Sequence, residues 1–487
     1  MQIAPAMRLI WVHVCWSRPC MLLPTLNCKR MRPRCGFPVR SGGIFRDNAP
    51  PVPSNRLASV RRYMKPTNPA DSHPDRRPGA LAHLKVLDMS RVLAGPWAGQ
   101  ILADLGAQVF KIERPGTGDD TRSWGPPYLQ DRYGNETHES AYFMGANRGK
   151  QSVAVDISKP EGQALVRKLA AQCDVLLENY KAGDLARYGL DYETLHALNP
   201  GLIYCSITGF GQDGPMSKVA GYDFVVQAMG GLMSITGERD DLPGGGPQKV
   251  GVAVSDITTG LYSAVAVLAA LAYRTRTGMG QYIDMALLDV QVAMIANMNM
   301  NYLVSGRVPG RQGNAHANIV PYQVFEAADG QLVLAIGNDS QFAKFCEIAG
   351  CALAMDARFA RNADRVRNRE ALIPQLEKIL RERSVVQWVE LLEPLGVPVG
   401  PINNLAQVFE HPQVRSRGLQ IELPHPQSGT VPLVGSPIRM SASPVRYERA
   451  PPMLGQHTRQ VLRQQLGVND EELDRLAALG VIQGTAV

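Results

Sequence analysis

The sequence predicts an α/β protein, with a doubly wound, Rossmann-like parallel-sheet large domain and a smaller α+β domain. Short apolar runs alternate with helical patterns between residues 84 and 207, which predicts the parallel sheet. Beyond Gly306 the pattern changes to a hairpin and amphipathic helices, which predicts the second domain. The chain has 487 residues and is 45% hydrophobic, so it can bury a large core.

The first βαβ unit follows from apolar spacing. Residues 84–89 have the pattern of a buried strand, residues 97–105 that of a helix, and residues 108–113 that of a second strand. Gly95 and Pro96 mark the start of the helix. A strand, a helix and a strand at this spacing predict parallel pairing with a right-handed crossover.

The same reasoning supplies the later elements. In the large domain, strands are predicted at residues 152–155, 175–178 and 202–207, and helices at residues 160–171, 258–275 and 287–303. In the small domain, a hairpin is predicted to join residues 322–327 to 331–336, before helices at 340–348 and 370–381. Ligands of doubly wound sheets bind at the carboxyl ends of the strands, so we expect the chemistry there.

The net charge of +7 is confined to the N-terminal leader. Residues 1–63 hold eleven Lys and Arg residues and one acid, Asp47, so the remaining body is near −3 and needs no nucleic-acid partner. The longest apolar stretch of the leader, residues 9–16, is too short to span a bilayer, and no membrane partner is expected. The leader could be upstream sequence before a true start at Met64, a transit peptide or a functional tail.

The cysteines and the missing motifs exclude several classes of protein. The eight cysteines show neither zinc-ligand spacing nor the density of a disulfide framework, which favours a reducing cytoplasmic setting. A mitochondrial location is the alternative, if the leader is a transit peptide. The sequence has no P-loop, GxGxxG, HExxH or GxSxG motif, so ATP-driven ligation, NAD chemistry and metal or serine hydrolysis are disfavoured. No metal site is expected.

Asp256 is the carboxylate with two local interpretations. It follows an apolar, strand-like run at residues 250–254 and precedes a predicted helix. An aspartate there can cap the helix N-terminus. The same position suits a nucleophile, because helix amides favour the ionised carboxylate and strand ends face the cleft. The local sequence leaves both interpretations open.

Ordered motifs along the chain carry a resemblance to a known family. They include Arg91-Val-Leu-Ala-Gly-Pro, Gly118-Asp-Asp-Thr-Arg, Asn147-Arg-Gly-Lys, Ala220-Gly-Tyr-Asp, Gly313-Asn-Ala-His and Gly396-Val-Pro-Val-Gly-Pro. In order and spacing the chain resembles the family III (CaiB/BaiF) CoA-transferases over roughly residues 82–483. The resemblance implies CoA transfer from an acyl-CoA, with succinyl-CoA the expected donor, to a dicarboxylate such as glutarate or hydroxymethylglutarate. CoA is then a substrate, and no cofactor is held permanently.

The resemblance also assigns site residues. It makes Asp256 the nucleophile that carries an aspartyl-CoA thioester, and it places ten further residues at CoA or substrate. The expected CoA contacts are Val92, Leu93, Arg114, Val155, Asn179, Lys181, Arg187 and Tyr222, and the expected substrate contacts are Gly313 and His316. The chain departs from the family at Ser158, where a lysine near the 3′-phosphate is expected and Lys159 follows one place later.

Two alternative functions are weighed against transfer. The related alpha-methylacyl-CoA racemases pair the aspartate with the histidine of a Gly-His-Asp motif, whereas this chain has Tyr222 in that place. Tyrosine, with an ordinary pKa near 10, is a poor base at neutral pH. A non-catalytic acyl-CoA-binding protein is the other alternative, and the presence of Asp256 argues against it only weakly.

The resemblance finally implies an assembly and a division of the chain. The expected assembly is an interlaced homodimer. The expected segments are a disordered leader and linker at residues 1–80, a large α/β CoA-binding domain at 81–285, a linker helix with the small α+β domain at 286–424, and a C-terminal return to the large domain at 425–487.

Overall fold

The computed structural model describes residues 78–484. The predicted leader at residues 1–63, and the three explanations for it, lie outside the described residues. So does most of the predicted linker before residue 80.

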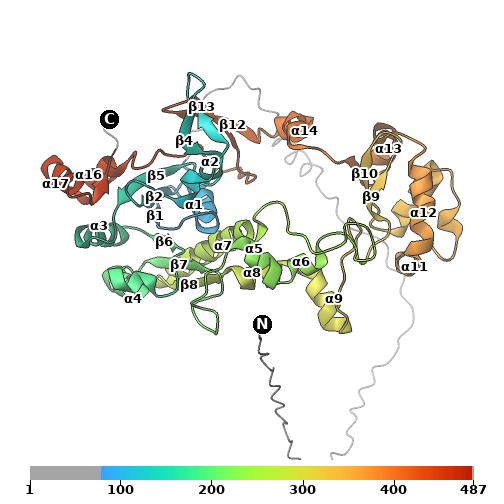
Figure 1. Cartoon of the computed structure of the whole chain (residues 1–487), viewed down its shortest axis with the longest axis horizontal. Coiled ribbons are helices and arrows are strands. Elements are labelled where there is room, and N and C mark those ends of the chain that lie inside the picture. Colours follow the sequence, from blue (N-terminus) through green and yellow to red (C-terminus); the bar gives the residue numbers. More distant parts are fainter. Residues whose placement is uncertain (1–77, 485–487) are drawn as a thin grey trace, which may run out of the picture. The chain divides into compact units, whose positions relative to one another are not determined.

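A seven-stranded sheet forms the centre of the large domain (Figure 1). In spatial order its strands are β14 (Ile482–Gln483), β5 (Lys150–Val155), β2 (Gln108–Glu113), β1 (Lys85–Asp88), β6 (Val175–Glu178), β7 (Ile203–Thr208) and β8 (Tyr282–Ala286). β14 pairs antiparallel with β5, and the other strands are parallel. Numbered along the chain, the parallel strands have the 3-2-1-4-5-6 order of Rossmann folds. The predicted parallel-sheet domain is confirmed.

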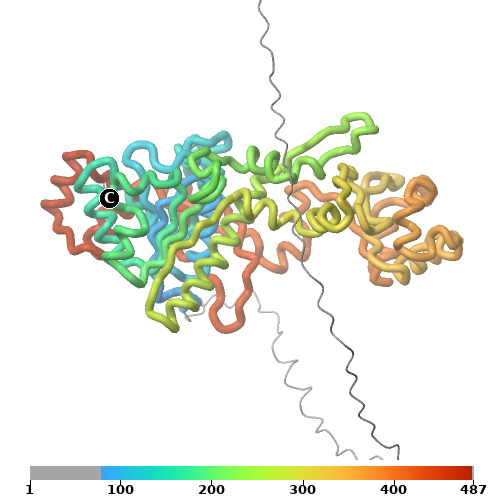
Figure 2. The backbone as a smooth tube through the Cα atoms, turned by 90° about the horizontal axis from the view of Figure 1, so that it is seen from below, coloured from blue at the N-terminus to red at the C-terminus, as the bar shows by residue number. Residues whose placement is uncertain are grey.

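Helices cover both faces of this sheet. The core on one face includes residues of α1 (Ala94–Asp104), α5 (Asp223–Met229), α7 (Val254–Thr277) and α8 (Leu287–Met294). The core on the other includes residues of α3 (Pro160–Ala170), α4 (Tyr192–Leu198), α16 (Thr458–Leu466) and α17 (Asp470–Ala478). The C-terminal helices, red in Figure 2, lie beside α3 and β5. Because both faces are covered, strands such as β5 and β6 are buried at every position.

The helix predicted at residues 287–303 is two helices, so that prediction was wrong. α8 ends at Met294 and α9 (Asn297–Ser305) follows, with Ala296 between them at a positive φ of 49°. Asn299 donates its side-chain N–H to the carbonyl of Val292, which lies in the last turn of α8. Apolar spacing alone continued through the break because methionines recur on both sides of it.

A second core surrounds a three-stranded antiparallel sheet of β9 (Tyr322–Glu326), β10 (Gln331–Ala335) and β11 (Val399–Pro401). Its helices are α10 (Asp339–Ile348), α11 (Asn362–Arg367), α12 (Arg369–Leu380) and α13 (Val385–Leu392). Phe342, Phe345 and Trp388 fill the interior. The predicted hairpin and both predicted helices of this region are present.

The remaining elements are short, and the sequence did not predict them. Two ribbons, β3 (Tyr128–Gln130) with β4 (Glu136–Ser140) and β12 (Gln420–His425) with β13 (Gly429–Val434), share a small core that includes Met144 and Leu423. The short α-helices are α2 (Ala141–Met144), α6 (Leu232–Ile235), α14 (Leu405–Glu410) and α15 (Pro412–Ser416). The 3₁₀ turns are η2 (Asp120–Ser123), η3 (Asp184–Tyr188), η4 (Leu353–Met355) and η5 (Glu393–Leu395).

Candidate active site

The strand order reverses between β1 and β6, which are neighbours in the sheet. In open α/β sheets a crevice forms at the carboxyl ends of the strands at this point. Two cavities lie here in the described structure, and Arg91, Asp120 and Tyr180 line both of them. We name them by one residue each, the Arg114 cavity and the Asp256 cavity.

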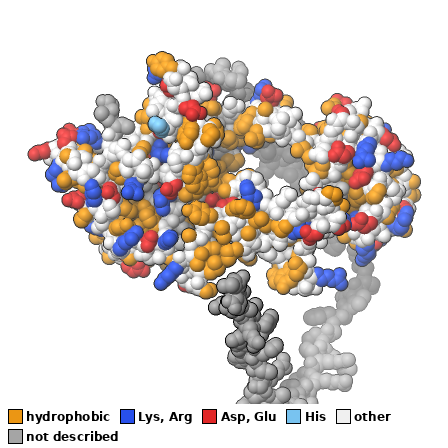
Figure 3. Space-filling view, in the orientation of Figure 1, with side chains coloured by type: hydrophobic (Ala, Val, Ile, Leu, Met, Phe, Trp, Pro, Cys, Tyr) orange, Lys and Arg blue, Asp and Glu red, His pale blue; other side chains and the backbone are white. Residues whose placement is uncertain are grey.

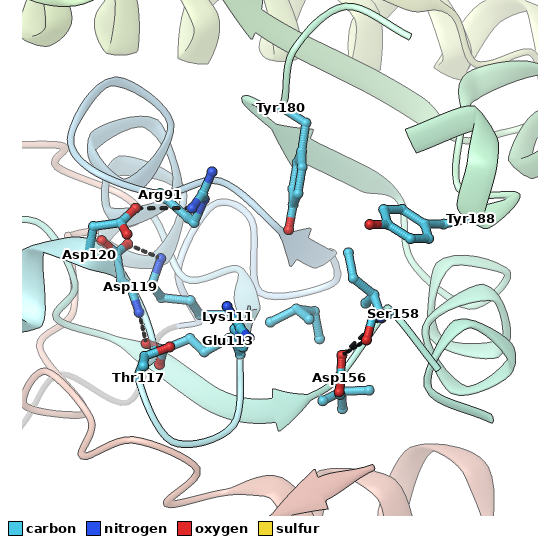
Figure 4. A pocket seen from close by; sticks show the side chains of 15 residues that line it. Arg91, Lys111, Glu113, Thr117, Asp119, Asp120, Asp156, Ser158, Tyr180 and Tyr188 are labelled. Atoms are coloured by element: carbon cyan, nitrogen blue, oxygen red, sulfur yellow. Dashed lines mark hydrogen bonds and ion pairs between the residues drawn. The ribbon is translucent and has the colours of Figure 1, made fainter. Parts of the chain in front are cut away.

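The Arg114 cavity has a volume of about 340 Å³. Tyr180 and Tyr188, from the chain that follows β6, lie across from Asp156 and Ser158, which follow β5 (Figure 4). Val155 brings an apolar surface to the wall. The charged residues of the wall are the cations Arg91, Lys111 and Arg114 and the acids Glu113, Asp119, Asp120 and Asp156, with Arg91 paired to Asp120 and Lys111 to Asp119. Two of the predicted CoA contacts, Arg114 and Val155, therefore line the same cavity.

The Asp256 cavity has a volume of about 290 Å³ and brings together more of the predicted residues. Val92, Leu93, Asn179, Lys181 and Tyr222 line it together with Asp256. These six residues come from four separate parts of the chain. The fold therefore brings these side chains together. From the sequence, only the family resemblance predicted that they share a site.

Asp256 is the third residue of α7, and the N-cap of that helix is Ala253. The strand-like run predicted at residues 250–254 is not a strand, because the N–H of Val250 donates to the side chain of Gln227 at 2.9 Å and pairs with no neighbouring strand. Burial in the cavity wall, and then the negative charge of Asp223, raise the pKa of Asp256 to about 7. A carboxylate with this pKa is a stronger base and nucleophile than an exposed one.

Gly260, in the second turn of α7, allows α7 to approach the start of α1 closely. A Cβ at this position would lie 2.6 Å from the carbonyl oxygen of Ala94, the first residue of α1. Leu93 and Ala94 at the start of α1, and Asp256 at the start of α7, all line the Asp256 cavity. Two helix N-termini thus contribute their positive ends to one cavity, which favours an anionic ligand or an oxyanion.

The segment between β1 and α1 is held by side chains from elsewhere in the fold. The side-chain amide of Asn179 accepts from the N–H of Arg91 at 2.8 Å and donates to its carbonyl at 2.7 Å. Lys111 donates to the carbonyl of Ser90 at 2.9 Å, and Asp119 accepts from the N–H of Val92 at 3.2 Å. These contacts fix three consecutive residues at the border of the two cavities.

The backbone of Val92 is strained, and the hydrogen bonds just described stabilise it. Its φ is 71°, in the left-handed region that a β-branched residue rarely adopts and that costs on the order of 1–3 kcal/mol. The contacts to Ser90, Arg91 and Val92 hold this conformation in place. The backbone of residues 90–92 is therefore held in place by the fold itself, without a ligand.

Beneath this segment lies a network of seven buried charged side chains. They are Asp88, Glu113, Asp119 and Glu139 with Lys111, Arg122 and Lys150. Burial alone would raise the pKa of Asp119, but the charge of Lys111, 2.8 Å away, and its hydrogen bonds lower it to about 2. Burial lowers the pKa of Lys150 to about 8, against the opposing effect of Asp88. The network supports the site from below, because Lys111 and Asp119 also hydrogen-bond to the backbone of Ser90 and Val92.

The other predicted residues line neither cavity, although Arg187 lies next to Asp184 and Tyr188, which do. Arg187 is exposed, with its guanidinium 3.8 Å from Asp184 and 4.7 Å from the ring centre of Tyr188. Gly313 packs against Glu238, and the His316 ring lies 5.3 Å from that of Tyr322. Lys159, which follows Ser158, donates to the carbonyl of Leu479 in the C-terminal region.

Sequence reasoning missed several residues of the site. Arg91 lines both cavities and pairs with Asp120 at 3.0 Å, although the sequence marks it only as the first residue of the Arg-Val-Leu-Ala-Gly-Pro motif. Asp223 accepts from the backbone N–H of Asp256 at 3.3 Å. The only signal for Asp223 in the sequence is its place in the Gly-Tyr-Asp motif, directly after Tyr222.

Comparison with known proteins identifies the family of the chain. Residues 81–458 match the family model for CoA-transferase family III. The chain belongs to CoA-transferase family III, as its motifs predicted, and it is an enzyme of that class.

Its similarity to individual relatives is high. It is 52% identical over 390 residues to the succinate–glutarate CoA-transferase of Agrobacterium fabrum, covering 80% of this chain and 96% of the relative. It is 44% identical over 403 residues to the human succinyl-CoA:glutarate CoA-transferase, covering 82% and 90%. A crystal structure of a CaiB/BaiF family protein from Brucella suis matches with a TM-score of 0.70 and 48% identity, covering 80% of this chain and 100% of that one.

Proposed function

We propose that the protein transfers CoA from succinyl-CoA to glutarate, or to a related dicarboxylate such as hydroxymethylglutarate, through a covalent intermediate on Asp256. One observation carries the proposal. Asp256 shares a cavity at the switch point of the sheet with Val92, Leu93, Asn179 and other predicted CoA contacts. The names of the Agrobacterium and human relatives supply the donor and the acceptor.

The chemistry follows from the position of the carboxylate. An oxygen of Asp256 attacks the thioester carbonyl carbon, the C–S bond breaks, and CoA leaves as a thiolate. The thiolate then attacks the aspartyl carbonyl of the mixed anhydride, which releases succinate and leaves an aspartyl-CoA thioester. The acceptor carboxylate reverses these steps. The free N–H groups at the start of α1 are suited to stabilise the oxyanions.

The two cavities suggest how CoA lies. Its phosphates would bind in the Arg114 cavity, near Arg91 and Arg114, with the apolar surface of Val155 against the adenosine. The thioester end would pass Val92 and enter the Asp256 cavity. Lys181 and the exposed Arg187 are further proposed contacts of CoA. Gly313 and His316 remain proposed contacts of the acceptor.

A panel of acceptors tests this function. With succinyl-CoA as donor, we expect the highest kcat/KM with glutarate or hydroxymethylglutarate, lower values with malate, citramalate and itaconate, and the lowest with oxalate. Mass spectrometry of the enzyme with succinyl-CoA alone is expected to show an adduct on Asp256. Epimerisation of a 2-methylacyl-CoA without transfer would instead indicate a racemase. CoA binding with neither transfer nor adduct would indicate a non-catalytic acyl-CoA-binding protein.

We also propose that the functional unit is an interlaced homodimer. Several described apolar side chains face outward: Leu261, Val265 and Leu268 on α7, and Leu303 and Val304 on α9, which has no buried residue. Broad apolar patches are visible in Figure 3. A cavity of about 1200 Å³ is lined largely by apolar residues, including Trp97, Ile101, Leu261, Phe409, Leu433 and Ile438. Monomeric proteins rarely expose so much apolar surface, and a second copy of the chain would cover it.

The dimer proposal predicts a concentration-dependent stability. Because each chain would complete the core of the other, dissociation and unfolding are expected to coincide, and the unfolding midpoint is expected to rise with protein concentration. Light scattering at each concentration gives the mass of the folded species. A stable, active monomer at low concentration would contradict the interlaced assembly.

The division of the chain and its location are proposed as predicted from the sequence. The segments are residues 1–80, 81–285, 286–424 and 425–487, and limited proteolysis is expected to cut first before residue 80. The proposed location is the cytoplasm. Cell fractionation of the full chain, and of a form that starts at Met64, would show whether residues 1–63 direct the protein to mitochondria instead.

A further inference from the structure

Asp223 caps the N-terminus of α7 from a different helix. It is the first residue of α5, and its Oδ1 atom accepts from the backbone N–H of Ser255 at 2.7 Å and from that of Asp256 at 3.3 Å. The N-cap residue of α7 itself, Ala253, has no side chain that could do this. The carboxylate of Asp223 thus takes the place of a capping side chain. The two N–H groups that it accepts from belong to the proposed nucleophile, Asp256, and to the residue before it.

Asp223 is held firmly in this place. Its second oxygen accepts from the side-chain amide of buried Gln227 at 2.6 Å, and the carbonyl of the same amide accepts from the N–H of Val250 at 2.9 Å. The segment before Asp223 is also fixed, because the backbones of Gly209 and Gly221 touch and a Cβ on either would lie 2.5 Å or less from the other. The hydrogen bonds from Ser255, Asp256 and Gln227 use both oxygens of Asp223 as acceptors, which suits a carboxylate and not an amide.

The arrangement puts a like charge beside Asp256. Among the groups that line the Asp256 cavity, Arg91 and Lys181 are cationic and Asp120 and Asp184 are anionic, while Ala94 of α1 and Leu287 of α8 do not titrate. Tyr142 of α2 also faces the pair, and burial and then the charge of Asp256 raise its pKa. After burial, the charge of Asp223 is the interaction that raises the pKa of Asp256.

We infer that Asp223 is a positioning residue with two roles in the reaction: it fixes the backbone of Asp256, and its charge favours the covalent form of Asp256. This inference rests on the proposed nucleophilic role of Asp256. When an oxygen of Asp256 bonds to the acyl carbon and the C–S bond breaks, the negative charge leaves with the CoA thiolate. The neutral acyl-aspartate no longer repels Asp223, so the repulsion that opposed the ionised enzyme is relieved.

The test is the pH dependence of kcat/KM in Asp223→Asn and Asp223→Ser. Both variants remove the charge, and serine keeps an acceptor that can cap the helix. Without the negative neighbour the pKa of Asp256 falls, so the acid limb of the profile is expected to move down by at least about one pH unit. The fraction of enzyme trapped as the covalent adduct with succinyl-CoA is expected to fall about tenfold. Asp223→Glu, which keeps the charge, should hold the limb near its wild-type position.

Asp284→Asn is the matched control. Asp284 is an exposed carboxylate on β8 that also accepts a backbone N–H, from Gln212 at 3.0 Å, and it lines neither cavity. Its replacement should leave the pH profile and the adduct unchanged.

Each outcome separates the two proposals. An active, folded Asp223→Asn or Asp223→Ser enzyme whose acid limb stays in place would overturn the role of the charge, even if Asp256 is the nucleophile. Failure of both neutral variants to fold, seen by circular dichroism and light scattering, would assign Asp223 to stability alone and overturn the inference as well. Full transfer by an Asp256→Ala enzyme would instead remove the proposed function on which the inference rests.

Discussion

Replacement of Asp256 by alanine is expected to lower CoA transfer by at least about a thousandfold, or about 4 kcal/mol of transition-state stabilisation. The change removes the carboxylate that carries the acyl group in the proposed mechanism. It removes little core volume, because Asp256 lies at the wall of a cavity. The measurements are kcat/KM with succinyl-CoA and glutarate, and the mass of the enzyme after incubation with succinyl-CoA alone.

The Asp256→Ala experiment has two controls: the same substitution at another aspartate, and a measurement of CoA binding. Asp470 is also an acid in the first turn of a helix, α17, and lies outside both cavities, so Asp470→Ala should transfer CoA at the wild-type rate. CoA binding to the Asp256→Ala enzyme, measured by calorimetry, should be preserved. Residual transfer within about tenfold of wild type, a barrier change of only about 1.4 kcal/mol, would rule out Asp256 as the nucleophile.

Replacement of Arg122 by alanine is expected to have the largest effect on stability, about 3–5 kcal/mol at neutral pH. The guanidinium donates to both oxygens of Glu113, at 2.7 and 2.8 Å, and to Glu139 at 3.0 Å. It also donates to the carbonyl of Pro452 and lies 3.7 Å from the ring centre of Phe143. Without it two buried carboxylates lose their counter-charge. Urea unfolding at fixed protein concentration measures the change.

Arg475→Ala provides the matched control. Arg475 makes the same two-contact pair with Glu472, at 2.7 and 2.8 Å, but both side chains are exposed. Its loss should change the free energy of unfolding by no more than about 0.5 kcal/mol. In the Arg122 variant the pKa of the unpaired carboxylates lies above the unfolded value, so the deficit should shrink as the pH is lowered. A deficit below about 1 kcal/mol at neutral pH would show that the network does not depend on Arg122.

The strands of the parallel sheet could be predicted from the sequence because they are short, apolar and bounded by turn residues. The predictions at residues 108–113 and 175–178 coincide with β2 and β6. The spatial order of the strands could not be obtained in this way, because apolar spacing describes one strand at a time. β14 has two residues and depends wholly on a partner that is distant in sequence, so no local pattern marks it.

The site, like the sheet, could be predicted from the sequence only in part. The family motifs supplied Asp256 and five residues that line its cavity, but they did not supply the charges beneath it. Lys111 has the alternating position of a solvent-facing residue in a strand, yet it is fully buried and pairs with Asp119. Only the folded chain shows that the loop after β2 returns to place Asp119 there. The cap made by Asp223 was missed for the same reason, since it joins two helices 32 residues apart.

The pairing of β14 with β5 has a consequence for the synthesis of the protein. Gln483 pairs with Ala154 and Ile482 with Val155, so the outer edge of β5 gains its partner strand only from a segment far along the chain. Further hydrogen bonds to β5, made by His457 and Thr458, also come from late in the chain. Roughly 300 residues are translated between the two strands, which takes about half a minute at about ten residues per second. Throughout that interval the nascent chain carries an open strand edge and a sheet face still without α16 and α17. We therefore expect an open edge of β5 to be a site of aggregation during synthesis, and chaperone protection in that interval to raise the yield of folded protein.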